Sequence, residues 1–209
     1  MRLVLATTNA GKTRELRRML AGQEQIDIDD LSAFRGIPVA QETGQTFAAN
    51  ASLKAAYYAR GLGAWTLADD SGLAVDALGG KPGVHSARWA AMHGQGEGDQ
   101  ANNALLLRQI EAVADDRRTA RFICTLALAD PHGNVLMPAT DWIEGRLLRA
   151  ERGLGGFGYD PLFLIDAEGR TTAELEPDHK NRISHRGKAM KRMTGMILRH
   201  LAGSQCFLI

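Results

Sequence analysis

The chain is organised around the stretch Arg2-Leu3-Val4-Leu5-Ala6-Thr7-Thr8-Asn9-Ala10-Gly11-Lys12. Residues 2–6 are a mostly apolar run that predicts a short buried strand. Helical periodicity follows the turn, with Leu16, Met19 and Leu20 on one face. A strand, a turn and a helix start in this order aim backbone N–H groups at a bound phosphate. The stretch therefore predicts an α/β unit whose turn has the composition of an anion-binding site.

Three interpretations of this turn are open. Gly11-Lys12-Thr13 fits the end of a Walker A loop, G-x-x-x-x-G-K-[ST], but Ala6 replaces the first glycine. Alternatively, Thr7, Thr8 and Asn9 donate to a phosphate chain while Lys12 supplies the neutralising charge. The third interpretation is an ordinary helix start, capped by Thr8 or Asn9, with a solvated lysine. The remainder of the chain has to decide between them.

The composition limits the classes of protein that the chain can belong to. It has 209 residues, 44% of them hydrophobic, which suits one large domain or two lobes that share a core. The 25 Lys and Arg residues nearly balance the 24 Asp and Glu residues, so the formal net charge is +1. We therefore expect no nucleic-acid polymer and no anionic membrane as a partner, and any site for a polyanion must be local.

Cysteine use and hydropathy point to a cytoplasmic protein. Cys124 and Cys206 make neither a disulfide framework nor a zinc site, which fits a reducing compartment. No apolar run approaches the length of a membrane span, and the N-terminus does not have the pattern of a signal peptide. The last four residues, Cys206-Phe207-Leu208-Ile209, have the spacing of a prenylation box. We treat this as coincidence because Ile is not typical there and no polybasic run precedes it.

A pair of aspartates is the first candidate for chemistry. The apolar run at residues 65–68 ends in Asp69-Asp70-Ser71-Gly72, and the ends of strands are where open α/β sheets place their sites. If the strand continues, the two carboxylates point to opposite faces, so one can enter a site while the other supports the turn. An Asx turn at a strand end is the ordinary alternative. Together with Glu42, the pair has the oxygen ligands that suit Mg²⁺ or Mn²⁺.

A clear helix pattern begins at Thr46, the expected N-cap. Its apolar stripe is Phe47, Ala51, Ala55 and Tyr58, and a neighbouring face, expected to be exposed, carries Asn50, Lys54 and Tyr57. Before this helix, residues 25–29 and 37–41 have short strand-like patterns around the turn-prone Arg35-Gly36.

The middle of the chain predicts a helix and then a hairpin. Residues 84–89 have alternating character, with His85 expected to be solvated and Arg88 to be structural. Asp99 is expected to cap a helix that buries Leu106, Ile110 and Val113. Residues 119–130 and 134–148 read as long strands joined by Pro131-His132-Gly133. Two antiparallel strands after βα units predict a mixed sheet with helices on its faces.

Two further clusters follow the hairpin. In Gly153-Leu154-Gly155-Gly156-Phe157-Gly158-Tyr159-Asp160-Pro161, the glycines allow close backbone approach and the aromatic rings offer a stacking surface. Lys180-Asn181-Arg182-Ile183-Ser184-His185-Arg186-Gly187 precedes a helix whose core side carries Met190, Met193, Ile197 and Leu201. Cations at a helix N-terminus are unfavourable unless an anion or a polar ligand is present, although an ordinary solvated face is the alternative.

Six motifs in this order resemble the inosine triphosphate pyrophosphatase family over nearly the whole chain. They are Ala6-Thr7-Thr8-Asn9-Ala10-Gly11-Lys12, Glu42-Thr43-Gly44-Gln45-Thr46-Phe47, Ala68-Asp69-Asp70-Ser71-Gly72-Leu73, Gly79-Gly80-Lys81-Pro82-Gly83, Gly156-Phe157-Gly158-Tyr159-Asp160-Pro161 and Ser184-His185-Arg186-Gly187. The resemblance implies an elongated mixed β-sheet flanked by helices, with residues 1–209 forming a single domain of two lobes and the active-site groove between them. It also implies Mg²⁺-dependent hydrolysis of ITP, dITP and XTP to the monophosphate and pyrophosphate by a homodimer.

The resemblance also assigns residues. It makes Asp70 the proton acceptor and a Mg²⁺ ligand, with Glu42 assisting the metal. The residues that contact the triphosphate are Thr7, Thr8, Asn9, Ala10, Gly11 and Lys12. Ser71 also contacts the substrate. The residues that surround the base and sugar are Phe157, Gly158, Tyr159, Asp160, Lys180, His185 and Arg186. Family members commonly carry an acidic residue at the position of Ala49, so the metal shell here leans on Glu42 and Asp70 or on water.

Three other functions remain as alternatives. The first is a related pyrophosphatase for modified pyrimidine nucleotides. The second is a nucleotide sensor without turnover, which the candidate pair Glu42 and Asp70 disfavours. The third is a P-loop kinase, which Ala6 disfavours.

Overall fold

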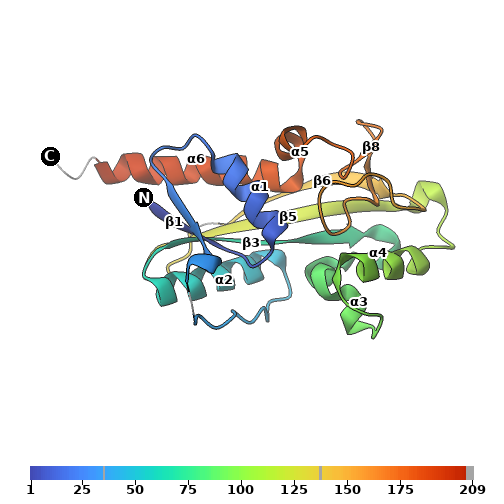
Figure 1. The fold of residues 1–209 in the computed structure, drawn as a ribbon, viewed down its shortest axis with the longest axis horizontal. Helices are drawn as coiled ribbons and strands as arrows, with labels where there is room; N and C mark the ends of the chain where they lie inside the picture. Colours follow the sequence, from blue (N-terminus) through green and yellow to red (C-terminus); the bar gives the residue numbers. More distant parts are fainter. Residues whose placement is uncertain (35, 137, 206–209) are drawn as a thin grey trace. The chain divides into compact units, whose positions relative to one another are not determined.

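The computed structural model describes residues 1–34, 36–136 and 138–205, whose ribbon is drawn in Figure 1. The chain divides into two compact units. Unit 1 comprises Met1–Asp70, Thr125–Asp141 and the chain from residue 186 onward; unit 2 comprises Ser71–Cys124 and Trp142–His185. Three of the four boundaries fall inside strands, so those strands contribute residues to both units. Arg35 and Cys206–Ile209, which carried part of a turn prediction and the prenylation-like spacing, lie outside the described residues.

One mixed sheet contains the strands, in the order β2-β1-β3-β5-β6-β7-β8, with β4 paired to β3. The bounds are β1 Arg2–Ala6, β2 Asp27–Asp30, β3 Trp65–Val75, β4 Lys81–Pro82, β5 Thr119–Ala129, β6 Ala139–Leu147, β7 Phe163–Ile165 and β8 Arg170–Thr171. β1 pairs in parallel with β2 and β3, whereas β6 with β7 and β7 with β8 are antiparallel. The predicted mixed α/β sheet is confirmed.

Helices connect these strands. The α-helices are α1 Ala10–Leu20, α2 Phe47–Leu62, α3 Trp89–Met92, α4 Gly98–Gln109, α5 Pro177–Ile183 and α6 His185–Gln205. Short 3₁₀ helices are η1 Leu31–Ala33, η2 Asp76–Leu78, η3 Gly83–Arg88 and η4 Asp115–Arg117. None of the helices in the described ranges is long and apolar enough to cross a membrane.

Unit 1 packs its helices on both faces of its strands. In Figure 1, α2 lies on one side of β1 and β3, and α1 and α6 lie on the other. The α2 side is built from small residues, because Ala51, Ala55 and Ala59 pack against Ala6 and Ala68. Such small side chains allow the helix to approach the sheet closely. Because α2 lies close to the sheet, a longer side chain on α2 can reach β3.

Unit 2 has a core of larger side chains. Leu106 of α4 and its C-cap residue Ile110 pack with Phe122 of β5, and Tyr159 and Phe163 belong to the same buried cluster. Phe122 and Phe163 have ring centroids 4.5 Å apart. This packing fixes the position of α4 against the loop that contains Tyr159.

Several predicted elements differ from the structure. Residues 37–41 form no strand, and residues 84–88 lie in the 3₁₀ helix η3 instead of alternating. β3 does not end before Asp69 but continues to Val75, so the aspartates lie inside a strand. The two aspartates nevertheless follow the last residue of β3 that pairs with β1, because β1 ends at Ala6, opposite Ala68.

Other predicted elements are confirmed. The 119–130 and 134–148 hairpin appears as β5 and β6, closed by an antiparallel bridge between Ala129 and Val135, although β6 begins only at Ala139. Met190, Met193 and Ile197 are buried on α6. The side chain of Leu201, predicted for the same stripe, is not among those described.

Candidate functional site

The turn after β1 is a capped helix N-terminus. The side-chain oxygen of Asn9 accepts from the backbone N–H of Lys12 at 3.0 Å, and the N–H of Asn9 donates to Thr7 Oγ1 at 3.2 Å. The intrahelical ladder begins with the N–H of Thr13 donating to the carbonyl of Asn9, so the amides of Ala10 and Gly11 precede it. Capping by Asn9 is therefore confirmed, and the layout is one that suits an anion.

Lys12 is not a solvated lysine, so that part of the third interpretation is wrong. Its Nζ lies 2.6 Å from Asp69 Oδ1, and Arg186 Nε donates to Asp69 Oδ2 at 2.7 Å. Arg186 also pairs with Glu15 of α1. Burial alone would raise the pKa of Asp69, but the charges of Arg186 and Lys12 hold that pKa well below its ordinary value. Asp69 is therefore a permanent anion that fixes two cations.

Asp70 belongs to a second cluster with Glu42 and Lys54. Lys54 Nζ lies 2.6 Å from Glu42 Oε1 and 3.1 Å from Asp70 Oδ1, and donates to the carbonyl of Asp69 at 2.9 Å. Burial raises the pKa of Asp70, and the charge of Lys54 only partly offsets this effect. Burial lowers the pKa of Lys54, but Asp70 and Glu42 outweigh burial and raise it. Lys54 therefore stays an ammonium while Asp70 is poised to take up a proton.

The adjacent aspartates contact different helices, as strand alternation predicts. Asp69 pairs with Lys12 of α1 and Arg186 of α6, whereas Asp70 pairs with Lys54 of α2. Successive side chains of a strand point to opposite faces, and the helices of unit 1 lie on both sides. One carboxylate therefore holds Lys12 of the turn after β1 in place, while the other belongs to the cluster with Glu42 and Lys54.

Asn50 fixes the segment that carries Glu42. It is fully buried rather than exposed as expected, and its Oδ1 accepts from the N–H of Gly44 at 2.8 Å. A side chain at position 44 would collide with Asn50, because a Cβ there would lie 2.7 Å from Asn50 Oδ1. Thr46 caps α2 by accepting from the N–H of Ala49 at 3.1 Å, as predicted.

The donors of the acidic cluster fit a divalent cation that also binds its substrate. Asp70 Oδ2 is buried and has no hydrogen-bond partner in the described ranges. Within those ranges, no group of three or more Asp, Glu, His or Cys side chains could enclose a metal ion. Mg²⁺ typically takes one or two carboxylates and completes its shell with water and phosphate oxygens. Glu42 and Asp70 match this incomplete shell.

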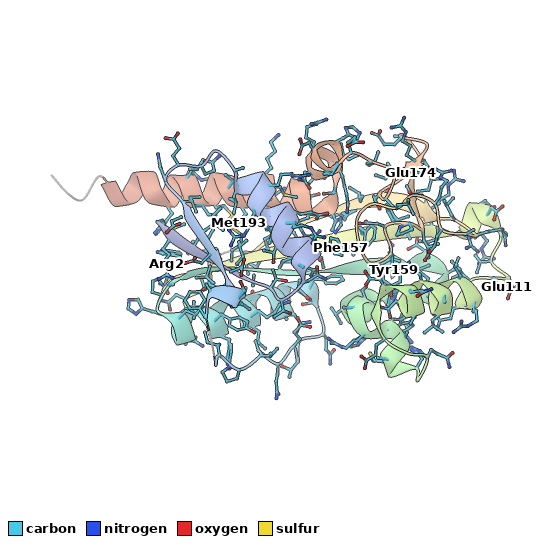
Figure 2. The ribbon with its side chains drawn as sticks, in the orientation of Figure 1. Arg2, Glu111, Phe157, Tyr159, Glu174 and Met193 are labelled. Carbon is cyan, nitrogen blue, oxygen red and sulfur yellow. The ribbon has the colours of Figure 1, made fainter. Side chains whose placement is uncertain are left out.

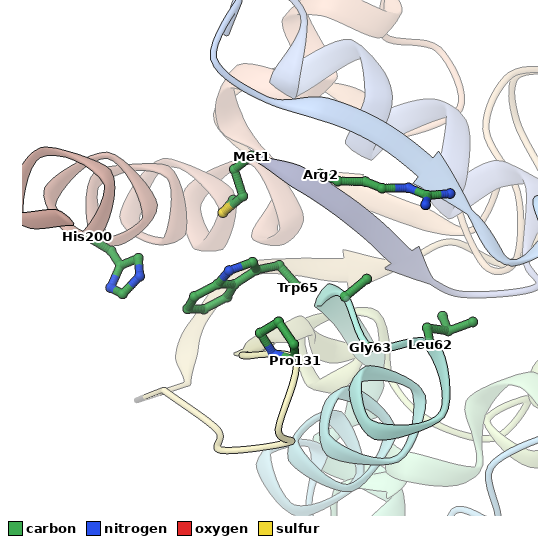
Figure 3. A pocket seen from close by; sticks show the side chains of 8 residues that line it. Met1, Arg2, Leu62, Gly63, Trp65, Pro131 and His200 are labelled. Carbon is green, nitrogen blue, oxygen red and sulfur yellow. The ribbon is translucent and has the colours of Figure 1, made fainter. Parts of the chain in front are cut away.

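A separate pocket of unit 1 lies at the start of β1 and β3. It has a volume of about 360 Å³, and its lining includes Met1, Leu62, Trp65, Pro131 and His200 (Figure 3). The rings of Trp65 and His200 have centroids 4.7 Å apart. None of the candidate site residues lines this pocket.

In unit 2, Asp160 organises the glycine-rich loop. Its Oδ2 accepts from the N–H of Phe157 at 2.8 Å and from Lys180 Nζ at 2.5 Å, and its Oδ1 accepts from Thr172 Oγ1 at 2.8 Å. Gly156 has φ +75°, and a Cβ there would lie 2.0 Å from Asp160 Oδ2. Asp160 is thus committed to groups of the protein itself, while its predicted contact with substrate stays a prediction.

The aromatic residues of this region have different environments. Lys180 Nζ lies 5.2 Å from the centroid of the half-buried Phe157 ring. Tyr159 is buried in the core and donates to the carbonyl of Ser86 at 2.9 Å, and burial raises its pKa. Figure 2 labels both residues among the side chains. His185 is buried and stacks on Phe122, with ring centroids 4.9 Å apart. Of these rings, Phe157 is the one that leaves part of its surface uncovered.

The structure thus groups the predicted residues by unit. Unit 1 contains Glu42, Asp70, Arg186 and the turn from Thr7 to Lys12, and unit 2 contains Ser71, His185, Lys180 and the loop from Phe157 to Asp160. Sequence reasoning missed Lys54, Asn50 and Glu15. The helical spacing of Asn50 and Lys54 was visible, but their partners are distant in sequence. Glu15 carried no signal beyond an acidic residue in a basic helix.

The fold and site define a class: a mixed-sheet α/β protein in which a capped strand–turn–helix start and a cluster of Glu42, Lys54 and Asp70 belong to one unit. The sequence profile of the Ham1 family matches residues 3–196. The chain belongs to the Ham1 family.

Known proteins of this family are similar over most of their length. The chain is 49% identical to the dITP/XTP pyrophosphatase of Streptomyces coelicolor, covering 97% of this chain and 99% of that protein. Identity to the dITP/XTP pyrophosphatase of Geobacillus kaustophilus is 48%, covering 91% of each. The structure of a HAM1 protein from Coxiella burnetii matches with a TM-score of 0.83 and 38% identity, covering 95% of this chain and 99% of that one.

Proposed function

We propose that this protein hydrolyses the deaminated purine nucleotides ITP, dITP and XTP to the monophosphate and pyrophosphate, removing them from the nucleotide pool. The observation that carries the proposal is the cluster of Asp70, Lys54 and Glu42, which supplies a proton acceptor, a fixed cation and metal-binding oxygens within one unit. Relatives named dITP/XTP pyrophosphatase, at 48% and 49% identity, support the substrate class.

The turn after β1 is the proposed holder of the triphosphate. The amides of Ala10 and Gly11 precede the intrahelical ladder, so they offer donors for phosphate oxygens. Hydroxyl and amide groups of Thr7, Thr8 and Asn9 add further donors. Lys12 supplies positive charge next to them while Asp69 fixes its position.

Glu42 and Asp70 are the residues that would hold Mg²⁺. The bound ion would neutralise phosphate charge and thereby favour the attack of a nucleophile. The unpartnered Asp70 Oδ2 is the oxygen best placed to bind the ion, because Oδ1 is already near Lys54. Asn50 supports this arrangement by fixing the segment of Glu42.

Asp70 is the proposed proton acceptor. It takes a proton from the water whose oxygen attacks the α-phosphorus; a bond forms between that oxygen and phosphorus, and the bond to the bridging oxygen of the β-phosphate breaks. Pyrophosphate leaves with the electron pair of the broken bond and is stabilised by Lys12 and the turn amides. The raised pKa of Asp70 makes proton uptake easier than for an exposed aspartate.

Ser71 is a proposed substrate contact, and recognition of the base and sugar is assigned to Phe157, Gly158, Tyr159, Asp160, Lys180, His185 and Arg186. Phe157 offers a ring on which a purine can stack. Arg186 is the proposed donor to the 6-keto oxygen; adenine has an amino donor at that position, so the pair would be mismatched. In the structure the guanidinium binds Asp69 and Glu15, which would hold it in one orientation.

The assembly and the compartment are also part of the proposal. We expect a homodimer in the cytoplasm. The resemblance to the family supports the dimer, and the presence of only two cysteines supports a reducing compartment.

A panel of nucleoside triphosphates tests the activity. ITP, dITP, XTP, ATP, GTP and modified pyrimidine triphosphates are each incubated with Mg²⁺, and pyrophosphate and orthophosphate are measured separately. The proposal expects pyrophosphate from the first three, with rates at least about a hundredfold above that for ATP. Preference for pyrimidines would indicate the related pyrophosphatase, binding without turnover would indicate a sensor, and phosphate transfer to an acceptor would indicate a kinase.

A further inference from the structure

Two side chains of α4 bind the backbone of Gly158, the residue that follows Phe157. Asp99 Oδ2 accepts from the N–H of Gly158 at 2.6 Å, and Asn103 Nδ2 donates to the carbonyl of Gly158 at 3.2 Å. Asp99 and Asn103 are four residues apart, so they lie one turn apart on the same face of α4. One helix therefore holds both polar groups of one loop residue.

The arrangement differs from an ordinary helix start. Asp99 was expected to cap α4, but the N-cap is Glu97, and Asp99 lies in the first helical turn with its carboxylate on the loop. Asn103 is 3% exposed, and its Nδ2 also donates to Glu151 Oε1 at 2.8 Å. Asn103 thus binds the loop at Glu151, before the glycines, and again at Gly158.

These contacts restrain the backbone from which the Phe157 ring projects. Gly158 has φ +62°, so its peptide units have an orientation that other residues rarely adopt. On the other side of Phe157, Asp160 accepts from the Phe157 N–H at 2.8 Å. The backbone is therefore held at the N–H of Phe157 by Asp160 and at Gly158 by the two side chains of α4.

We infer that Asp99 and Asn103 are positioning residues for recognition of the purine base. They do not touch the nucleotide themselves, but they hold the loop so that Phe157 meets the base. The inference rests on the proposed function, since it uses that function's assignment of Phe157. It predicts that loss of either contact weakens binding of the base and sugar but leaves binding of the pyrophosphate group unchanged, because the phosphate-binding residues belong to unit 1.

The test compares Asp99→Ala, Asp99→Asn and Asn103→Ala with wild type. For each folded variant, calorimetry gives the Kd for inosine monophosphate, kinetics gives kcat and KM for ITP, and inhibition gives the Ki for pyrophosphate. We expect the Ala variants to raise Kd and KM about 5- to 30-fold, in the lower part of the range for losing one partner of a buried hydrogen bond. kcat should change less than about threefold and the Ki for pyrophosphate less than about twofold, while Asp99→Asn, which keeps an acceptor, recovers most of the affinity.

Asn102→Ala is the matched control. Asn102 is a buried asparagine of the same helix, but it accepts from the N–H of Ala90 and donates to the carbonyl of Ala87 instead of binding the loop. The inference is overturned if Asp99→Ala, whose side chain is exposed and whose fold should survive, binds inosine monophosphate as wild type does. It is also overturned if Asn102→Ala loses as much affinity, or if pyrophosphate binding weakens in parallel. Wild type that neither binds the monophosphate nor releases pyrophosphate would instead refute the proposed function.

Discussion

Lys54→Met removes the cation that joins Glu42 to Asp70. The Lys54 side chain is 11% exposed and its Nζ lies within 3.1 Å of both carboxylates. Breaking a buried ion pair costs about 3–5 kcal/mol. Because the Glu42 side chain is 25% exposed, solvent screens part of the repulsion, and we expect about 3 kcal/mol. For a chain of this length, that corresponds to a fall in Tm of about 6–12 °C.

The same substitution should change the response to metal and to pH. Without the ammonium, the two carboxylates attract a divalent cation more strongly, so added Mg²⁺ should raise the Tm of Lys54→Met more than that of wild type. The charge of Lys54 also lowers the pKa of Asp70, so its loss raises that pKa further. The acidic limb of the pH–rate profile should move to higher pH, because Asp70 must be unprotonated to act as a base.

Differential scanning calorimetry in EDTA and then in Mg²⁺, with pyrophosphate release measured across pH, checks these effects. Lys191→Met, at an exposed position of α6, is the control for loss of a lysine charge. A Tm for Lys54→Met in EDTA that lies within about 2 °C of the control would show that the ion pairs of Lys54 do not stabilise the fold, since loss of a buried ion pair should lower the Tm by several degrees. An unchanged acidic limb would show that Lys54 does not influence the catalytic group.

Three further predictions concern the two units. Asp70→Asn should lower pyrophosphate release from ITP by about 10²- to 10⁴-fold while circular dichroism shows an intact fold; a variant with near-normal turnover would remove Asp70 as the base. The low pKa of Asp69 stabilises the folded state above the unfolded pKa, so the difference in unfolding free energy between wild type and Asp69→Asn, from urea titrations in EDTA, should shrink as pH falls below about 4. A pH-independent difference would contradict this assignment. Gly156→Ala should lower the unfolding free energy more than Gly158→Ala, because both have positive φ but only the first places a Cβ against Asp160; equal losses in urea titrations would mean that the contact with Asp160 does not matter.

Local patterns predicted β1, α1 and α2 of unit 1 well. The β1 strand, the cap at Asn9 and the cap at Thr46 follow from periodicity and side-chain chemistry within a few residues. Strand alternation also accounts for the different partners of Asp69 and Asp70, because it places their side chains on opposite faces. These features depend on residues that are close together in the sequence, so local patterns are sufficient to predict them.

Contacts between distant segments could not be predicted in the same way. Lys54 and Asn50 looked like an exposed helix face, but the small residues of α2 bring that helix close enough to β3 for Lys54 to reach Asp70. Asp99 had the position of a cap, yet its carboxylate binds the N–H of Gly158, which lies 59 residues further along the chain. In both cases tertiary packing, rather than propensity, decides the partner.

Residues 37–41 show a limit of short patterns. Their apolar alternation is too brief to distinguish a strand from a connecting segment, and in the structure Ala40 is held instead by its N–H donating to Tyr58 Oη at 3.1 Å. The segment therefore packs on α2 without joining the sheet. That contact leads the chain to Glu42 at the acidic cluster.

In the proposed reaction, water attacks the α-phosphorus of a deaminated purine triphosphate. Hydrolysis of ITP in ¹⁸O-labelled water, followed by mass spectrometry of the products, identifies the phosphorus atom that is attacked. We predict that the label appears in inosine monophosphate and that the released pyrophosphate contains none. Label in pyrophosphate, or release of orthophosphate with inosine diphosphate, would contradict the proposed reaction.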